Sequence, residues 1–520
     1  MARIERTKNA SRNIVFGILL KLYQILVPFA MRTVMIYLMG VQYLGLNSLF
    51  TSILQVLNLA ELGVGSAMVF SMYKPIADDD AQSICKLLRL YRVYYRVIGL
   101  LIAVVGCALT PVIPKLIHGT VPANLNIYVL YLLNLAATVC SYWLFAYKNS
   151  LLQAHQRTDV VSKVGLLTST IQYGLQMFVL WAFHNYYLYV LVALFTQALT
   201  NILTALAATR FYPQYKPKGK ISKAQIQKIN QRIRDLFTSK VGAIVYNSAD
   251  TIVVSACLGL TVLAVYQNYF YILNAVSSLI AVAFSACTAA IGNSIVTESR
   301  KKNFRDFDTF TFIIFWIGGV CSVCLLCLYQ PFMELWVGRD LMLPFSAVIC
   351  FVIYFYVYQY NSLLNMYKDA AGLWHEDRWR PLISALVNLA LNLILVHFIG
   401  IFGVLLSTVL AILFVGMPWL IHNLFTIIFD RKYMIPFLWK IFQYSLMVII
   451  SCVICFFLCQ WVHLESFAGL IIRGLICVMA SCLIYYLAFR KSVQFQRTLH
   501  LTNSMTKGKM YRILIKLGMK

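Results

Sequence analysis

The sequence predicts an all-α polytopic membrane protein with about fourteen transmembrane helices. Of its 520 residues, 61% are hydrophobic and the mean hydropathy is +0.76, whereas soluble proteins are about 45–50% apolar. Charged residues make up only 12% of the chain. Apolar runs of roughly twenty residues, each long enough to cross the hydrocarbon core of a bilayer, recur along its length.

The spans follow these apolar runs in order, with basic residues gathered in the loops between them. The polar N-terminal segment leads straight into the first run, without the short apolar core and cleavage site of a signal peptide. We predict spans at residues 13–39, 43–72, 87–110, 124–147, 158–183, 186–212, 236–258, 262–297, 307–330, 342–367, 378–398, 401–428, 436–461 and 467–490.

The distribution of positive charge predicts the side of the membrane that each loop faces. With the N-terminus inside, 39 of the 44 Lys and Arg residues lie in the inner loops and tails or in the inner halves of the adjoining spans. Only Lys115, Arg339 and Arg473 lie on the outer side, while Lys21 and Arg32 lie within the first span. Because Lys and Arg accumulate on the cytoplasmic side, we expect a multi-pass protein with both termini in the cytoplasm. The net charge of +26 then reflects the inner membrane surface and not a nucleic-acid partner.

A weak internal repeat and one long basic loop predict two lobes. At an offset of 219 residues, Met39-Gly40 matches Leu258-Gly259, and at an offset of 220 His155 matches His375. Such repeats are typical of secondary transporters with a binding site between the halves. The predicted organisation is an N-lobe of spans 1–6 at 1–212, a basic cytoplasmic linker at 213–235, a C-lobe of spans 7–12 at 236–430, spans 13–14 at 431–490, and a basic cytoplasmic tail at 491–520.

Ionisable residues inside the spans are the strongest candidates for function. A charge at the centre of a transmembrane helix costs about 2.5–3.5 kcal/mol on insertion scales, so it normally faces a cavity or a partner. Lys21 and Arg32 share one face of the first span, and Lys240 lies near the start of the seventh. Glu61 and Asp250 are the acids well inside spans. For both acids, a transport role and a structural ion pair are equally compatible with the sequence. The structural partner of Asp250 would be Arg32.

Polar stripes at helical spacing predict a wet face on several spans. The same amides, hydroxyls and rings are also typical of hydrogen bonds that hold transmembrane helices together, so cavity lining and helix packing remain open alternatives. The candidate cavity residues are Gln24, Asn58, Asn247, Gln267, Asn274, Tyr354, Tyr358, Asn361 and Asn365.

The motifs that resemble those of enzymes lack the surrounding residues that their chemistry requires. The run Asp78-Asp79-Asp80 stands in a short loop without a nucleotide-binding domain, which favours a solvated turn. Cys321, Cys324 and Cys327 have part of a cluster spacing, but no fourth Cys follows nearby and the span is apolar, which favours packing. There is no Walker A sequence and no paired His motif. We therefore expect no enzyme activity, no cofactor and no metal.

Two segments carry a family resemblance. The stretches ELGVGSAMVFSMYKPIADDD at 61–80 and NSADTIVVSACLGLTVLAVYQNYFYI at 247–272 resemble bacterial polysaccharide flippases of the Wzx type. These belong to the multidrug/oligosaccharidyl-lipid/polysaccharide (MOP) exporter superfamily, with the lipid II flippases and the MATE exporters. The resemblance implies two six-helix bundles with alternating access in the bacterial cytoplasmic membrane. It also implies that an undecaprenyl-diphosphate-linked oligosaccharide is moved to the outer leaflet for capsule or exopolysaccharide synthesis.

This cargo suggests roles for the candidate residues. Arg32, with Lys21 and Lys240, is expected to bind the diphosphate, since guanidinium matches phosphate bidentately. The cavity residues are expected to bind sugar, and Glu61 and Asp250 to serve ion coupling or gating. Expected partners are the lipid-linked oligosaccharide and membrane lipids, with a polymerase and glycosyltransferases as further candidates. There are three competing functions. A MATE-type cation-coupled exporter predicts an anionic cavity, and a membrane glycosyltransferase or polymerase predicts a large outer loop with acids or His. The third is a scaffold without transport.

Overall fold

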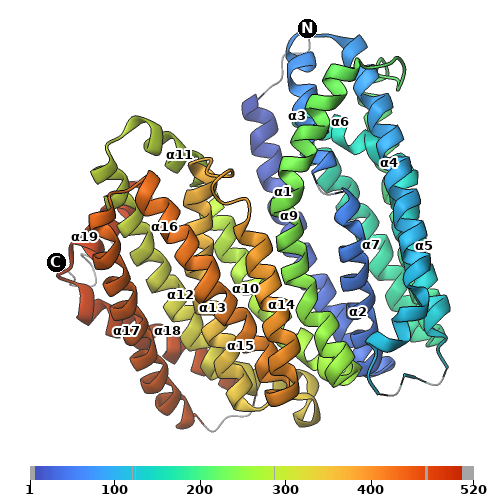
Figure 1. Ribbon diagram of the computed structural model, residues 1–520. Helices are drawn as coiled ribbons and strands as arrows, with labels where there is room; N and C mark the ends of the chain where they lie inside the picture. Colours follow the sequence, from blue (N-terminus) through green and yellow to red (C-terminus); the bar gives the residue numbers. More distant parts are fainter. Residues whose placement is uncertain are drawn as a thin grey trace. The chain divides into compact units, whose positions relative to one another are not determined.

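The computed structural model describes residues 6–61, 63–119, 121–122, 124–285, 287–462 and 466–505. Within them the chain is helical, and no strand occurs (Figure 1). Contacts group the chain into two compact units, Met1–Gln267 and Asn268–Lys520, with the division inside one helix. The lobe and linker boundaries stay predictions. The basic residues from Lys507 to Lys520 lie outside the described part.

Unit 1 begins with a long helix that continues through Pro28 and ends at Leu38. Helices α1 and α7, α2 and α9, α4 and α5, and α7 and α8 pack in pairs. The helices are α1 (Arg6–Leu38), α2 (Val41–Leu57), α3 (Val64–Ala77), α4 (Ala81–Leu109), α5 (Ile127–Trp143), α6 (Asn149–Ala154), α7 (Thr158–Phe183), α8 (Tyr186–Phe211), α9 (Lys223–Leu258) and α10 (Leu260–Ser285), the last of which continues into unit 2.

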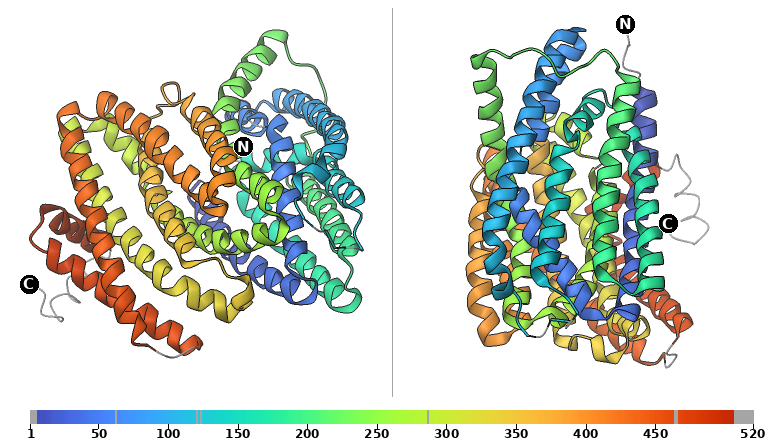
Figure 2. Two further views of the ribbon diagram at one scale, coloured as in Figure 1. Left: turned by 60° about the horizontal axis from the view of Figure 1, so that its bottom comes forward. Right: turned by 90° about the vertical axis from the view of Figure 1, so that its right-hand side faces the viewer.

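Unit 2 is built around α12, which packs against α13, α17, α18 and α19. The helices of the C-terminal end, drawn in red, lie together in both views (Figures 1 and 2). The helices are α11 (Thr288–Thr297), α12 (Arg300–Val337), α13 (Phe345–Ala370), α14 (Arg380–Ile399), α15 (Ile401–Ala411), a π turn at Ile412–Gly416, α16 (Met417–Ile427), α17 (Met434–Gln460), α18 (Phe467–Phe489) and α19 (Val493–Met505).

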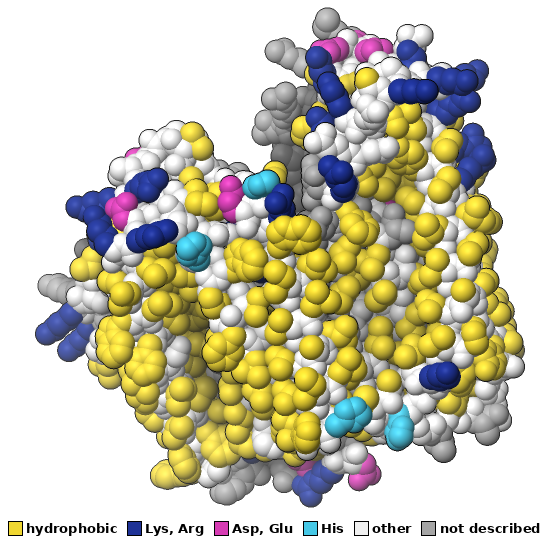
Figure 3. All heavy atoms as spheres, in the orientation of Figure 1, with side chains coloured by type: hydrophobic (Ala, Val, Ile, Leu, Met, Phe, Trp, Pro, Cys, Tyr) yellow, Lys and Arg dark blue, Asp and Glu magenta, His cyan; other side chains and the backbone are white. Residues whose placement is uncertain are grey.

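The fold class expected from hydropathy is confirmed. Nine helices in the described chain are long and apolar enough to cross a membrane, or ten if α5 and α6, bent by 48°, form one span. Large apolar side chains cover the outside of the helices, and Phe398 is 80% exposed, as suits contact with lipid. On the face drawn in Figure 3, most Lys and Arg side chains of each unit lie toward one end of its helices.

Two predicted spans are broken in ways that hydropathy did not reveal. The run 43–72 forms α2 and α3, separated by a 3₁₀ turn at Asn58–Glu61 and by Gly63 in the left-handed region. The run 262–297 ends its first helix at Ser285 and starts α11 at Thr288. Both breaks free backbone groups and polar side chains inside an apolar segment, which the tertiary structure must satisfy.

Polar caps decide where several helices begin. The side chain of Ser222 accepts a hydrogen bond from the backbone of Gln225 and starts α9 at Lys223. The second half of the basic segment predicted as a linker is therefore helical. Ser299 caps α12 in the same way, because a side-chain oxygen satisfies a donor that the first helical turn leaves unpaired.

Glycine forms equivalent junctions at the two matched positions of the repeat. Gly40 joins α1 to α2 with φ +107°, and Gly259 joins α9 to α10 with φ +91°. A side chain is strained at such φ values. At Gly259 a Cβ would also approach the carbonyl oxygen of His118 to 2.8 Å. The two ends of the 219-residue offset thus share one backbone conformation.

Candidate functional site

Glu61 lies at the break between α2 and α3, at the end of the 3₁₀ turn. Its two carboxylate oxygens accept hydrogen bonds from different helices. Tyr95 of α4 donates its hydroxyl to Oε1 at 2.6 Å, and Tyr142 of α5 donates to Oε2 at 2.8 Å. The helix break thus positions one acidic group between two tyrosine hydroxyls in the interior of unit 1.

Two further polar groups, Asn58 and Tyr91, lie next to the tyrosines that contact Glu61. Asn58 Oδ1 lies 3.1 Å from the hydroxyl of Tyr142, and the hydroxyls of Tyr91 and Tyr95 are 2.9 Å apart. Within the described residues, Glu61 forms no ion pair with Lys or Arg. Neutral hydroxyl donors therefore stabilise this carboxylate, and a change in its charge would alter the hydrogen bonds of three helical segments.

The sequence indicated Asn58 and Glu61 but not the tyrosines that hold them. Tyr91 and Tyr95 are spaced i, i+4 on α4, and both are buried, which the apolar character of that helix obscures. Tyr142 comes from a helix 81 positions away from Glu61. A search for tyrosines at helical spacing inside apolar runs would have flagged the α4 pair.

The predicted cationic face of α1 is not uniform. Lys21 and Gln24 are exposed on the surface of unit 1, whereas Arg32 is half-buried. Arg32 interacts electrostatically with Tyr189 of α8. The helical backbone of α9 includes Lys240 and Asn247, but their side chains lie outside the described part of the chain.

Asp250 and Gln267 lie where α9 meets α10. Asp250 is 8% exposed, and the hydroxyl of Tyr266 is 3.5 Å from its Oδ2. Gln267 donates its amide to Thr251 Oγ1 at 2.8 Å. Asn274, one to two turns farther along α10, is exposed. The predicted polar stripes of α9 and α10 therefore touch where Gln267 contacts Thr251, whereas Asn274 lies on the exposed surface.

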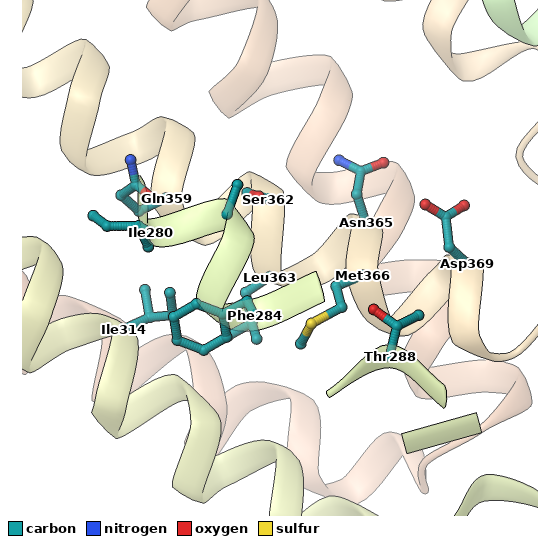
Figure 4. Close-up of a pocket in the computed structure, with 11 residues that line it drawn as sticks. Ile280, Phe284, Thr288, Ile314, Gln359, Ser362, Leu363, Asn365, Met366 and Asp369 are labelled. Atoms are coloured by element: carbon teal, nitrogen blue, oxygen red, sulfur yellow. The ribbon is translucent and has the colours of Figure 1, made fainter. Parts of the chain in front are cut away.

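In unit 2 the predicted stripe of α13 leads into a cavity of about 260 Å³. Figure 4 shows Asn365 and Asp369 toward one side of this cavity and Ile280, Phe284 and Ile314 toward the other. Asn365 Oδ1 accepts a hydrogen bond from Arg380 at 2.8 Å. The cavity thus offers amide and carboxylate groups beside an apolar wall, which suits a ligand with hydroxyls and an apolar face.

The rest of that stripe is packed more tightly. Tyr354 is buried, and its ring centroid lies 5.8 Å from that of Tyr358. The backbone carbonyl of Asn361 accepts a hydrogen bond from the side-chain amide of Asn365, while the Oδ1 of Asn361 is buried without a hydrogen-bond partner among the described residues. An unsatisfied buried amide oxygen is costly and marks a place where a ligand or water donor would be stabilised.

Each unit contains a buried acid that the sequence did not single out. Asp377 is 3% exposed and binds Arg380 at 2.5 Å and Lys368 at 3.5 Å. Arg380 reaches from this pair to Asn365, so the ion cluster braces one wall of the cavity. The spacing Asp-x-x-Arg at a helix start was the available signal.

In unit 1 the corresponding acid is Asp159, which binds Arg157 at 2.9 Å and Lys163 at 3.8 Å. The hydrogen bond with the Asp159 carboxylate raises the pKa of Arg157 above its ordinary value. The guanidinium of Arg157 also lies 4.6 Å from the ring centroid of Phe211, which ties the start of α7 to the end of α8.

A second cavity, of about 530 Å³, lies where α3, α4 and α9 meet in unit 1. Asp80 at its rim caps α4, and its hydrogen bonds with Ser83 lower the pKa of the Asp80 carboxyl. The Asp78–Asp80 turn thus has a local structural role. The cavity is lined by four cations and two acids, Lys74, Lys86, Lys228, Arg232, Asp78 and Asp80.

Comparisons with solved structures agree with this architecture. The lipid II flippase MurJ in an inward closed conformation superposes with a TM-score of 0.66, at 15% identity, over 92% of this chain and 99% of that one. An inward-facing multidrug resistance MATE transporter of the MOP superfamily gives 0.59, at 15% identity, over 83% and 98%. A MOP superfamily transporter from Pyrococcus furiosus, whose title describes a binding pocket of reverse polarity, gives 0.51, at 14% identity, over 82% and 96%.

The described residues form a polytopic α-helical fold similar to those of the lipid II flippase MurJ and of a MATE transporter of the MOP superfamily. Residues 10–289 match the family model described as polysaccharide biosynthesis protein. The chain belongs to this polysaccharide biosynthesis protein family, and the resemblance expected from residues 61–80 and 247–272 is confirmed. A comparison with curated protein sequences gave no match.

Proposed function

We propose that the chain is a flippase that moves an undecaprenyl-diphosphate-linked oligosaccharide from the inner to the outer leaflet of the bacterial cytoplasmic membrane. The observation that carries the proposal is the polysaccharide biosynthesis family match on a MOP fold similar to that of a lipid II flippase. The transported sugar would feed capsule or exopolysaccharide synthesis, with a polymerase and glycosyltransferases as neighbours.

The anionic headgroup requires cations on its route, because a diphosphate cannot enter lipid uncompensated. We assign this role to Arg32, with Lys21 and Lys240 as further contacts. Its half-buried position on an apolar helix supports the assignment of Arg32. The basic cavity lined by Lys74, Lys86, Lys228 and Arg232 provides a first contact for the same diphosphate on the side from which it is loaded.

The sugar requires hydroxyl partners and flat apolar surfaces. The cavity in unit 2 combines both, since Asn365 and Asp369 face it together with Phe284. Tyr354 and Tyr358 on the same helix extend the aromatic surface. Asn361, with its unsatisfied amide oxygen, is the residue best prepared to accept a hydrogen bond from a sugar hydroxyl.

The carboxylate of Glu61 is our candidate for coupling transport to an ion. A proton would neutralise a carboxylate held by two hydroxyls, and Na⁺ would find oxygen ligands on Glu61 and Asn58. Either event alters the hydrogen bonds that join the α2–α3 break to α4 and α5. Asp250, buried between α9 and α10, is the second candidate for coupling or gating.

The test uses a bacterial strain that lacks the chain and accumulates lipid-linked sugar on the inner leaflet. Wild type is expected to restore surface polymer and to clear the accumulated lipid. Arg32→Ala is expected to reduce export at least about tenfold, and Arg32→Lys to restore part of it, because a point charge replaces the bidentate contact. Lys302→Ala, which removes an exposed cation paired with Glu298, is the control.

Normal polymer output from Arg32→Ala, at wild-type protein level, would remove the phosphate role from that residue. Failure of the wild-type chain to clear the accumulated inner-leaflet lipid would remove the flippase function itself.

A second candidate function is a MATE-type cation-coupled exporter of small molecules. The fold similarity to a MATE transporter and the acidic group at Glu61 favour it. This function predicts that cells producing the chain survive higher concentrations of cationic drugs and that Glu61→Gln abolishes the protection. Unchanged drug sensitivity together with restored polymer export would leave the flippase as the function.

A further inference from the structure

Helices α12, α17 and α18 bring together most of the cysteines of unit 2. All 14 cysteines of the chain are free thiols. Spacings of three and four residues place thiols on one face of a helix. The cysteines on these three helices are Cys321, Cys324 and Cys327 on α12, Cys452, Cys455 and Cys459 on α17, and Cys477 and Cys482 on α18.

Three of these thiols converge on one point, and a fourth packs beside them. The sulfur atoms of Cys327, Cys459 and Cys477 all lie within 4.8 Å of one another, and each of the three residues comes from a different helix. The sulfurs of Cys459 and Cys477 are 3.5 Å apart. Cys324, nearly one turn before Cys327 on α12, is partly buried and packs against this cluster.

The burial of this group is nearly complete. Cys327 and Cys459 are each 6% exposed, and Cys477 is 0% exposed, inside an apolar cluster with Val323 and Cys455. The metal-ligand-type side chains in the group are all thiols, without a carboxylate or imidazole from the described residues. Thiolates are soft ligands and prefer Zn²⁺, Cu⁺ and other thiophilic ions to hard cations.

The geometry is close to that of a metal centre. Sulfurs at about 2.3 Å from a tetrahedral Zn²⁺ stand about 3.8 Å from one another. The observed separations therefore require only small side-chain rotations to close around an ion.

A neighbouring cation provides an independent observation. Arg473 lies one turn before Cys477 on α18, and its guanidinium donates to the backbone carbonyl of Val462 at 2.7 Å. Its Nε is buried without a hydrogen-bond partner among the described residues. The Cys459 sulfur lies 3.9 Å from the Arg473 carbonyl oxygen. A positive charge there stabilises a thiolate group, which would otherwise carry uncompensated negative charge in an apolar setting.

We propose that Cys324, Cys327, Cys459 and Cys477 form a binding site for a thiophilic d¹⁰ ion, Zn²⁺ or Cu⁺. Binding replaces the S–H protons of the ligating thiols by the metal and releases those protons, with no change in oxidation state. Cys459 is the penultimate residue of α17, so the ion can enter from the helix end. The bound ion cross-links α17 and α18 to α12 and stabilises the junction between the C-terminal helices and the rest of unit 2.

The experiment uses the full chain, purified in detergent under reducing conditions and stripped with a chelator. Zn²⁺ and Cu⁺ are added in separate arms, and bound metal is measured per chain after competition with a chromogenic chelator. We expect about one ion per chain in one arm, which identifies the metal. Co²⁺ as a spectroscopic substitute is expected to give the thiolate charge-transfer band of a tetrahedral site.

Matched variants on α18 complete the design. Cys477→Ser is expected to weaken binding more than about 100-fold, because it removes a sulfur that lies 3.5 Å from that of Cys459 and within 4.8 Å of that of Cys327. Cys482→Ser, on the same helix but outside the group, is expected to bind as wild type. Metal is expected to raise the Tm of wild type and Cys482→Ser but not of Cys477→Ser.

Three results would overturn the proposal. The first is substoichiometric binding of both metals by the wild-type chain without a cobalt thiolate band. The second is equal binding by wild type and Cys477→Ser. The third is a Cys459–Cys477 disulfide in the chain isolated from cells with its thiols trapped by alkylation. The wild-type cobalt spectrum does not depend on any variant, so misfolding of Cys477→Ser leaves the proposal testable.

Discussion

Asp159 in unit 1 and Asp377 in unit 2 are buried carboxylates with the same set of partners. Each binds one Arg and one Lys near the start of a helix, α7 for Asp159 and α14 for Asp377. Each also follows the histidine of a matched pair, His155 or His375, by a few residues. The repeated arrangement indicates that both halves of the chain use one buried ion cluster to set the entry angle of a long helix.

Loss of Asp377 is expected to destabilise the protein strongly. Asp377→Ala leaves the buried Arg380 without its acid, while Lys368 keeps its pair with Asp369 at 2.6 Å. Breaking a buried pair in this way costs about 3–5 kcal/mol. The measurement is the Tm in detergent. Glu298→Ala, which removes an exposed pair with Lys302, is the control and is expected to change stability by less than about 1 kcal/mol. Equal shifts in the two variants would contradict a special role for burial.

The charge of Glu61 is expected to control transport and not folding. Glu61→Gln keeps the shape of the side chain but removes its negative charge, so we expect export to fall at least about tenfold. Tyr142→Phe removes one of the two hydroxyl donors and keeps the charge, so export should fall only several-fold. Tyr128→Phe on the same helix, with an exposed ring, is the control.

Polymer export is measured at matched protein levels. A Glu61→Gln variant that exports at the wild-type rate would exclude the carboxylate from coupling.

A methyl group is expected to be harmful at Gly45 and harmless at Gly174. A Cβ at Gly45 of α2 would meet the backbone of Leu260, including its carbonyl carbon at 2.9 Å, and a backbone cannot rotate aside. Gly45→Ala should therefore cost about 1–3 kcal/mol. Gly174 on α7 has no heavy atom within 4 Å of such a Cβ, so Gly174→Ala should be neutral or stabilising by up to about 1 kcal/mol. Thermal unfolding of the two variants is the measurement. Equal stability of Gly45→Ala and Gly174→Ala would show that the backbone at Leu260 moves aside without cost.

Helix α19 is expected to loosen when its polar anchor is removed. Gln494 donates to Oδ2 of the buried Asp308 at 2.8 Å, while Lys440 holds Oδ1 at 2.7 Å. A hydrogen bond to a charged group contributes about 1.5–3 kcal/mol, so Gln494→Ala should speed amide exchange in α19 by roughly 10- to 100-fold. Gln496→Ala, on the exposed side of the helix, should leave exchange unchanged. Equal exchange in both variants would mean that ring contacts alone, such as Phe495 on Trp316, hold the helix.

Hydropathy predicted the helices well because a backbone in lipid must pair its own hydrogen-bonding groups, and an apolar run of sufficient length can do so only as a helix. The predicted start at residue 158 and the observed start of α7 at Thr158 coincide. The errors fell at helix breaks, since the segment around Glu61 and the segment after Ser285 are apolar enough to continue a span. At such points, contacts with other helices outweigh the local pattern.

The pattern of residues was sufficient to predict an integral membrane protein with basic loops, and it indicated Glu61, Asp250 and Arg32 as unusual, because isolated charges stand out against an apolar background. Tertiary packing alone decided which side chains from distant parts of the chain come into contact. Glu61 meets Tyr142, and Cys327 meets Cys477, across distances of many tens of residues in the chain. Periodicity specifies which residues share one helix face, but the rotation of each helix about its axis is set by all the neighbours it packs against, and these come from distant parts of the chain.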